Sequence, residues 1–222
     1  DYQTDTRQYA VFFDDTLQLT EKLSLVLGGR YDDIDFDRFD LAIGGNPAAS
    51  FSTHFSEFTW RAGLVYQPID GMSIYAQAST AADPVTSPIS ISAGNKDFDL
   101  AMGRQYEVGL KQQLFDGRAE YTLAYFDIEK SNVVEKNSSG DYELLGEVRS
   151  KGVETELLMK PLENWQVKLG YAYVDSEISE NPDASIQGSR TPMTAYHDAY
   201  FWTKYNFPYQ VAGGVLGTTF GA

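Results

Sequence analysis

The sequence alternates between very short and long polar connections, and the segments between them alternate apolar with polar residues. The long connections run from Asp40 to Thr53, Ala81 to Met102, Lys130 to Asp141 and Ser179 to Thr194. The short ones recur at a nearly constant spacing of a little under fifty residues, at Thr20-Glu21-Lys22, Ile69-Asp70-Gly71, Asp116-Gly117, Leu162-Glu163-Asn164 and Asn206-Phe207-Pro208. With turns on one rim and loops on the other, the pattern predicts about ten strands of an all-β, antiparallel, up-and-down transmembrane barrel.

Individual segments show a period of two, as strands do when their faces meet different surroundings. From Trp165, one face is expected to carry Trp165, Val167, Leu169, Tyr171 and Tyr173, and the other Gln166, Lys168, Gly170 and Ala172. Charged residues fall repeatedly on the second kind of face, which the apolar interior of a soluble lipocalin-like barrel would not tolerate. A soluble β-sandwich also alternates, but its loops need not sort into a short and a long rim, so the sorting favours the barrel. The apolar faces are therefore expected to point outward to lipid, with aromatic residues near strand ends as interfacial girdles.

Composition excludes several other classes of protein. No stretch approaches the ~20 consecutive apolar residues that a membrane-spanning helix requires. The chain has no cysteine, which excludes disulfides and thiolate metal sites. Its net charge of −15 argues against binding nucleic acid. The two histidines have no metal-ligand spacing between them, so the sequence predicts no metal site and no catalytic one.

Five segments carry a resemblance to a known family. They are Arg61 to Pro68 followed by Ser73 to Ala76, Gly103 to Lys111, Phe126 to Val133, Gly146 to Glu154, and Trp202 to Tyr205. In this order the chain resembles the barrel of TonB-dependent outer-membrane siderophore receptors, from about Gln8 to Phe207.

The resemblance implies that residues 1–222 are part of a barrel of about 22 strands. The chain begins without an initiator Met and stops in a strand-like segment, so we expect a fragment cut at both ends, without signal peptide or plug domain. The implied function is import of ferric siderophores across the outer membrane of a Gram-negative bacterium, not an enzymatic reaction. The implied partners are the ferric siderophore as transported ligand, the TonB complex through the plug, and outer-membrane lipid and lipopolysaccharide.

The ligand is expected to bind aromatic faces and cationic donors at the outer rim. The candidates are Phe36, Arg38, Phe39, Phe51, Arg190 and His197, with His54 behind them. The segment from Gly188 to His197 is similar to a family pattern, although Tyr196 stands where proline is usual, which leaves the role of His197 open. A second set is expected to form lumen salt bridges facing the plug: Arg61, Glu107, Lys111 and Glu154.

Two other functions fit the strands. One is a passive diffusion pore. The other is a ten-stranded outer-membrane protease, whose paired acids and His-Asp couple would be Asp32-Asp33 and His197-Asp198. Adjacent residues in a strand point to opposite faces, which argues against the protease.

Overall fold

The computed structural model describes residues 2–41, 50–83, 100–136, 142–211 and 214–221. Within these ranges, no helix has the length and apolar character needed to cross a membrane. The strands are β1 (Tyr2–Thr20), β2 (Leu23–Asp40), β3 (Phe51–Tyr66), β4 (Met72–Asp83), β5 (Ala101–Leu114), β6 (Ala119–Lys136), β7 (Tyr142–Leu162), β8 (Trp165–Glu180), β9 (His197–Val211) and β10 (Gly214–Gly221).

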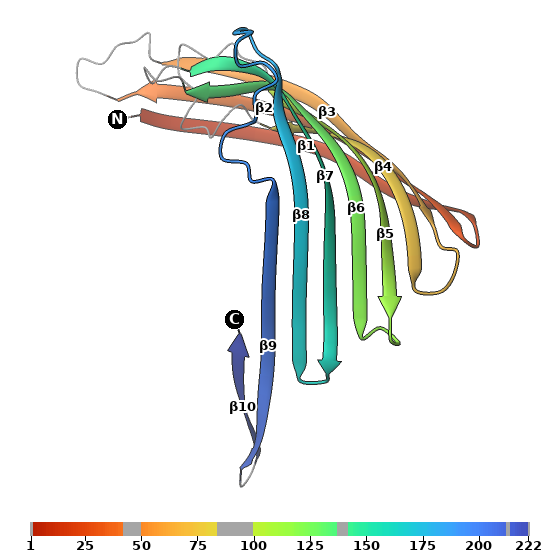
Figure 1. Ribbon diagram of the computed structural model, residues 1–222. Helices are drawn as coiled ribbons and strands as arrows, with labels where there is room; N and C mark the ends of the chain where they lie inside the picture. Colours follow the sequence, from red (N-terminus) through yellow and green to blue (C-terminus); the bar gives the residue numbers. More distant parts are fainter. Residues whose placement is uncertain (1, 42–49, 84–99, 137–141, 212–213, 222) are drawn as a thin grey trace.

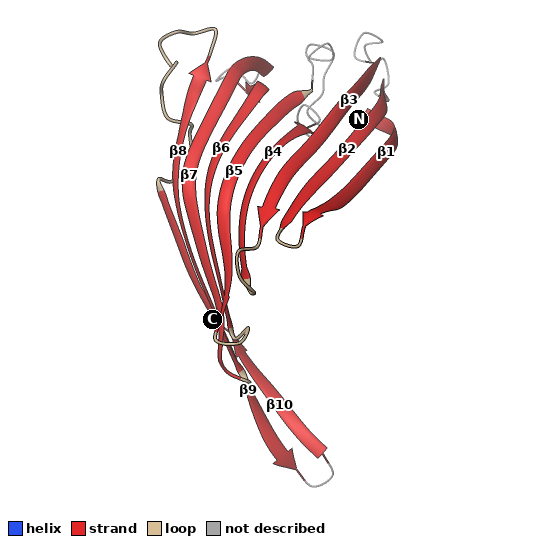
Figure 2. Cartoon of the chain, turned by 90° about the vertical axis from the view of Figure 1, so that its right-hand side faces the viewer, coloured by secondary structure: helices blue, strands red, loops and turns tan. Residues whose placement is uncertain are grey.

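The ten strands form one sheet in sequence order, and every neighbouring pair is antiparallel. The sheet bends into a strongly curved wall with a concave and a convex side, as Figures 1 and 2 show. β1 and β10 are its two edges. The predicted all-β, up-and-down architecture of about ten strands is therefore confirmed.

Four of the five predicted short connections lie where the structure turns. Each joins two consecutive strands within a few residues, and the four fall between β1 and β2, β3 and β4, β5 and β6, and β7 and β8. At Asp116-Gly117, both central residues have positive φ, 56° and 81°, as a type I′ turn requires. The Arg118 amide closes this turn by donating to the Phe115 carbonyl at 3.1 Å.

The fifth predicted connection, at Asn206-Phe207-Pro208, is wrong. These residues continue β9, which ends at Val211, and β10 starts at Gly214. β8 begins at Trp165, opposite Tyr205, so the end of β9 pairs only with β10 and projects below the wall in Figure 2. A proline lacks a backbone donor, and a strand tolerates one where a neighbouring strand is absent.

The predicted loop from Lys130 to Asp141 also starts too early, because β6 runs on to Lys136. The register between β6 and β7 shifts between Lys130 and Val133, and Asn132 has a φ of 55°. The extra residues form a bulge, which interrupts the ladder without ending the strand. Polar residues such as Ser131-Asn132 read as a loop in sequence although they are part of a strand.

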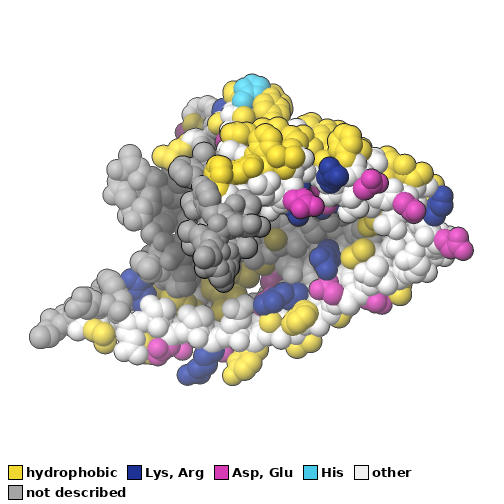
Figure 3. All heavy atoms as spheres, turned by 90° about the horizontal axis from the view of Figure 1, so that it is seen from below, with side chains coloured by type: hydrophobic (Ala, Val, Ile, Leu, Met, Phe, Trp, Pro, Cys, Tyr) yellow, Lys and Arg dark blue, Asp and Glu magenta, His cyan; other side chains and the backbone are white. Residues whose placement is uncertain are grey.

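The two faces of the wall differ in chemistry. In β8, the predicted apolar face is the outward one, with Leu169, Tyr171 and Tyr173 exposed. Seen from below in Figure 3, charged side chains line the hollow of the curve while hydrophobic ones gather on its outside. Few side chains are buried among the described residues, because the wall is a single layer with no second sheet against it. We call the concave side the lumen face and the convex side the outward face.

Candidate functional site

Three strands bring Glu156, Lys168 and Tyr200 together on the lumen face. The Lys168 ammonium lies 2.8 Å from Glu156 Oε2, and the Tyr200 hydroxyl donates to the same carboxylate. Tyr200 can reach across β8 because Gly170 lies beneath its ring, where a Cβ would overlap the ring atoms. The carboxylate is thus bound by one cation and one neutral donor, and its negative charge makes each of these bonds stronger than one between neutral groups.

A second lumen group on β4 and β5 repeats the pairing of a tyrosine hydroxyl with a glutamate. The Tyr75 hydroxyl donates to Glu107 Oε1 at 2.5 Å, and its ring covers Gly109. Nearby, Lys111 lies 3.2 Å from Glu120. The glycines on the predicted polar faces therefore make room for tyrosine rings that cross from the neighbouring strand.

Between these two groups the lumen face has a recess of about 390 Å³. Its walls come from β4 to β9, and its charged and polar lining includes Tyr75, Lys111, Glu120, Glu154, Glu156, Asp198 and Tyr200. Carboxylates outnumber ammonium groups in this lining. We call Glu107, Glu120, Glu154, Glu156 and Asp198 the lumen acidic cluster.

The lumen face of β1 to β3 is held by arginine. Arg61 crosses Gly28 and reaches Asp14 on β1, with Nη2 at 2.8 Å from Oδ1. Arg30 pairs with Asp32 at 2.6 Å. Of the residues expected to form lumen salt bridges, Arg61 and Lys111 thus do so, and Glu107 bonds to a tyrosine.

Three of the six candidate ligand residues lie together at the outer end of the lumen face. Phe36 is 2% exposed, and its ring centroid is 6.0 Å from that of Phe51. Arg38 is the register partner of Phe51 and points to the same side as Phe36, two residues away. Phe39 alternates to the outward face, where it is exposed.

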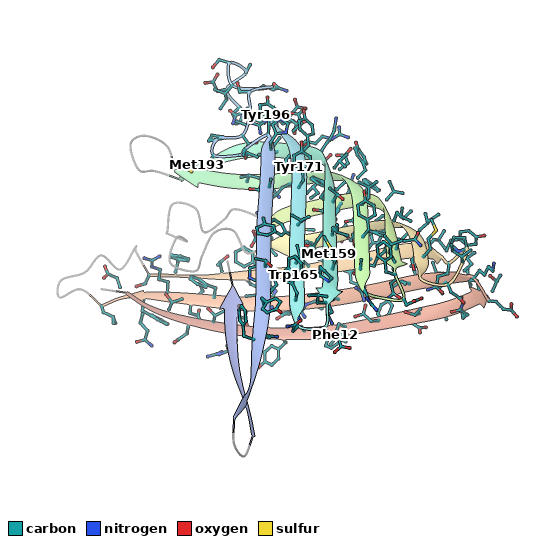
Figure 4. The ribbon with its side chains drawn as sticks, turned by 60° about the horizontal axis from the view of Figure 1, so that its bottom comes forward. Phe12, Met159, Trp165, Tyr171, Met193 and Tyr196 are labelled. Atoms are coloured by element: carbon teal, nitrogen blue, oxygen red, sulfur yellow. The ribbon has the colours of Figure 1, made fainter. Side chains whose placement is uncertain are left out.

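Arg190 and His197 lie on the outward face. The Tyr171 hydroxyl and His197 Nδ1 are 2.8 Å apart, and the His197 ring packs against Tyr173. Arg190 stacks on Tyr196 with its guanidinium carbon 3.3 Å from the ring centroid. Figure 4 places Tyr171 and Tyr196 at the same end of the wall, with Trp165 at the other end of β8.

The contacts of Arg190 hold the chain against β8. Its Nε and Nη2 donate to the Thr194 carbonyl at 3.0 and 2.9 Å, and Nη2 also reaches the Val174 carbonyl at 3.3 Å. Its Nη1 is buried and lies 3.8 Å from Asp175, too far for a hydrogen bond. We call Arg190, Tyr196, His197 and Tyr171 the outward clamp.

The dipeptides considered for a protease are split between the faces. Asp32 pairs with Arg30 on the lumen face, whereas Asp33 lies within 3.6 Å of His54 on the outward face. His197 is outward, and Asp198 lines the lumen recess. Neither dipeptide forms the side-by-side pair that water activation needs.

Sequence reasoning missed a chain of hydroxyl groups on the lumen face. Ser150 donates to Ser176 at 2.8 Å, and Ser176 to Thr191 at 2.9 Å. Thr191 reaches this position because the chain after β8 returns along it, with a bridge between Glu177 and Arg190. The polar composition of this stretch predicts a loop, and no local pattern reveals the return.

Comparison with known proteins identifies the family to which these features belong. The family model of TonB dependent receptor-like β-barrels matches residues 1–222. The TonB-dependent siderophore receptor PiuA of Acinetobacter baumannii is 26% identical over 96% of this chain, and the ferrichrome outer membrane transporter/phage receptor of Escherichia coli is 28% identical over 96%. The ferripyoverdine receptor of Pseudomonas aeruginosa is 31% identical over 76%.

Solved structures agree. The crystal structure of PiuA superposes with a TM-score of 0.79, covering 92% of this chain and 32% of that one. The E. coli ferric-catecholate import receptor Fiu, 25% identical, gives a TM-score of 0.74 with the same coverage. The chain spans 31% and 27% of the lengths of the curated PiuA and ferrichrome transporter sequences. These relatives are transport receptors rather than enzymes. The chain therefore belongs to the TonB-dependent receptor β-barrel family, whose members reside in the outer membrane of Gram-negative bacteria.

Proposed function

We propose that this chain forms part of the wall of an outer-membrane receptor that imports a ferric siderophore with energy delivered through TonB. The observation that carries the proposal is the match over nearly the whole chain to receptors named for iron chelates, ferrichrome and ferrioxamine B among them. The polar lumen face supports it, because a large hydrophilic chelate needs a wet path bounded by hydrogen-bonding groups.

The ligand contacts we propose are Arg38 and Phe51, with the buried Phe36 packing against the Phe51 ring. They share one face and one end of the wall, which is the end of the long connections. Aromatic rings bind the organic part of a chelate, and an arginine donates two hydrogen bonds to its oxygens. Phe39, Arg190 and His197 are not among these proposed contacts, because their outward position favours a role in the membrane-facing wall.

The lumen acidic cluster is proposed to face the plug domain through which TonB would act. An excess of carboxylates on the wall favours basic side chains on the opposing surface. The exposed aromatic and aliphatic residues of the outward face, in turn, suit outer-membrane lipid and lipopolysaccharide.

Uptake of radiolabelled ferric siderophores by cells that carry the full-length receptor tests the proposal. We expect Phe51→Ala combined with Arg38→Gln to lower uptake by about tenfold, the effect of roughly 1.4 kcal/mol of lost binding. Phe39→Ala is the matched control, because it removes a ring one residue from Arg38 but on the outward face, and it should leave uptake unchanged.

The same assay separates import from passive diffusion. Deletion of TonB should abolish uptake by an energised receptor. Uptake that continues without TonB would overturn the proposal in favour of a diffusion pore. Equal loss of uptake in Phe39→Ala would overturn the assignment of the ligand contacts.

A further inference from the structure

Asp33, Asp35 and His54 form a compact group on the outward face at the outer ends of β2 and β3. Asp33 and Asp35 are two residues apart and share a face, and His54 is the register partner of Asp35. His54 Nδ1 lies 3.0 Å from Asp35 Oδ1, and His54 Nε2 lies 3.6 Å from Asp33 Oδ2. One oxygen or nitrogen atom from each of the three residues lies within 4.8 Å of the other two.

The position of this group relative to the membrane follows from the residues below it. Tyr31 and Phe58 are register partners directly beneath, both about half exposed on the outward face, and Leu27 and Ala62 pair further down. Aromatic rings at this place mark the boundary between hydrocarbon and headgroups. The three residues therefore lie just beyond the apolar band, where charged groups and ions are solvated.

The charges around the group are not balanced as they are elsewhere on the outward face. Asp127 on β6 accepts hydrogen bonds from Nε and Nη2 of Arg149 at 2.9 and 2.6 Å. Within the described ranges, the ion-pair partner of Asp33 and of Asp35 is the imidazole of His54 alone, which carries a charge only when protonated.

The groups that face this site from the neighbouring strand do not supply the charge. Tyr9 and Arg7 are the β1 partners of Asp33 and Asp35, and Arg7 forms no ion pair within 4.0 Å among the described residues. Asp37, the next outward residue of β2, adds another carboxylate and accepts a hydrogen bond from Ser52 at 2.6 Å. The site therefore has donor atoms for a cation and a local excess of negative charge.

We propose that Asp33, Asp35 and His54 bind a divalent transition-metal ion, represented by Zn²⁺. An imidazole nitrogen with two carboxylate oxygens suits Zn²⁺, whereas Ca²⁺ and Mg²⁺ prefer sites made of oxygen alone. The ligand side chains are partly exposed, so they can close around an ion by rotation while the paired strands hold their Cα positions. The remaining coordination positions open to the headgroup layer.

The sequence predicted no metal site because its two histidines have no ligand spacing between them, and the aspartates lie in a different strand from His54. Only the pairing of β2 with β3 brings His54 opposite Asp35. The site lies on the other side of the wall from the proposed ligand contacts Arg38 and Phe51, so it is independent of the transported chelate.

Calorimetric titration of the full-length receptor in detergent micelles, first stripped with a chelator, tests the site with Zn²⁺ alone. We expect His54→Gln and Asp35→Asn each to weaken Zn²⁺ binding by at least the roughly 10–100-fold seen when groups supporting a ligand are removed. Asp37→Asn is the matched control, with the same strand, face and change of charge, and it should weaken binding far less because it removes nearby charge but no ligand atom.

Three results would overturn the site: no binding of Zn²⁺ by the unmodified receptor, equal weakening by Asp37→Asn, or Ca²⁺ binding more tightly than Zn²⁺. Siderophore uptake by the His54→Gln variant should equal that of the unmodified receptor. Failure of the metal site would thus leave the proposed import function intact, and failure of import would leave the metal site intact.

Discussion

The lumen group around Glu156 and the outward clamp around Arg190 are built on the same part of the wall, yet they satisfy their charges in opposite ways. On the lumen face, Glu156 is matched by the ammonium of Lys168 and a tyrosine hydroxyl. On the outward face, the Arg190 guanidinium is matched by backbone carbonyls and the Tyr196 ring.

The difference follows from what each face meets. A wet lumen can solvate ions that pair imperfectly, so it tolerates many carboxylates. A face turned to lipid and headgroups favours neutral acceptors, rings and closely paired charges such as Asp127 with Arg149, because an unpaired charge is costly beside hydrocarbon. Breaking each group by matched substitutions shows how far this contrast holds.

The largest loss of stability is expected from a substitution of Gly170, the glycine beneath Tyr200. In Gly170→Ala, the added Cβ would overlap the ring, so the ring must move away from Glu156. Overpacking of this kind costs about 1–3 kcal/mol. Gly103→Ala is the matched control on the lumen face, because its Cβ would have ordinary contacts of 3.6 Å with Ala81. Urea unfolding of the full-length receptor in lipid vesicles measures both, and equal costs would contradict the role of Gly170.

Removal of Arg190 from the outward clamp should cause the next largest loss of stability. Arg190→Ala loses the bonds to Thr194 and Val174, and we expect a cost of about 1–2 kcal/mol. The segment from Gly188 to Tyr196 should then be cut faster in limited proteolysis of the receptor. Arg190→Lys should not restore resistance, because an ammonium lacks the planar fork that stacks on Tyr196 while reaching Thr194. Full protection by lysine would show that charge alone holds the segment.

The sequence allowed the faces of these strands to be predicted, but not the groups formed on them. The alternation from Trp165 to Tyr173 identifies the side chains that point outward, because successive side chains of a strand point to opposite faces. The meeting of Arg190 with Tyr196 depends on a chain return that leaves no such period. The end of β9 was misjudged at Pro208 because a proline breaks a strand only where a neighbour needs its donor.

Of the six candidate ligand residues, sequence alone could not separate the lumen from the outward members. The outer end of β2 carries Asp33, Asp35 and Asp37 on its outward face, so the sequence does not show an apolar face there. Pairing with β3 resolves it, because Phe36 meets Phe51 while His54 meets the aspartates.

A smaller effect is expected from removing one hydroxyl on either face. Tyr200→Phe removes a bond to a carboxylate and should cost about 1 kcal/mol, while Tyr171→Phe removes a bond to His197 and should cost about half as much. Both leave the ring in place, so packing is conserved. Urea unfolding under identical conditions measures the pair, and a larger cost for Tyr171→Phe would reverse the contrast between the faces.

The smallest effect is expected from acid pH on the turn at Asp183, in the connection between β8 and the outward clamp. The Asp183 carboxylate accepts a hydrogen bond from the Ser185 amide at 2.9 Å, and this bond lowers the pKa of Asp183 below its ordinary value of 3.8. A lowered pKa means that the bond stabilises the turn at pH values above 3.8, and that this stability is lost as pH falls through the lower folded value.

Hydrogen exchange at residues 183–188, corrected for the intrinsic rate, should therefore accelerate in acid. Asp183→Asn keeps an acceptor oxygen but cannot titrate, so its exchange should not respond. If the unmodified turn is equally insensitive, the bond between Asp183 and the Ser185 amide does not stabilise this turn.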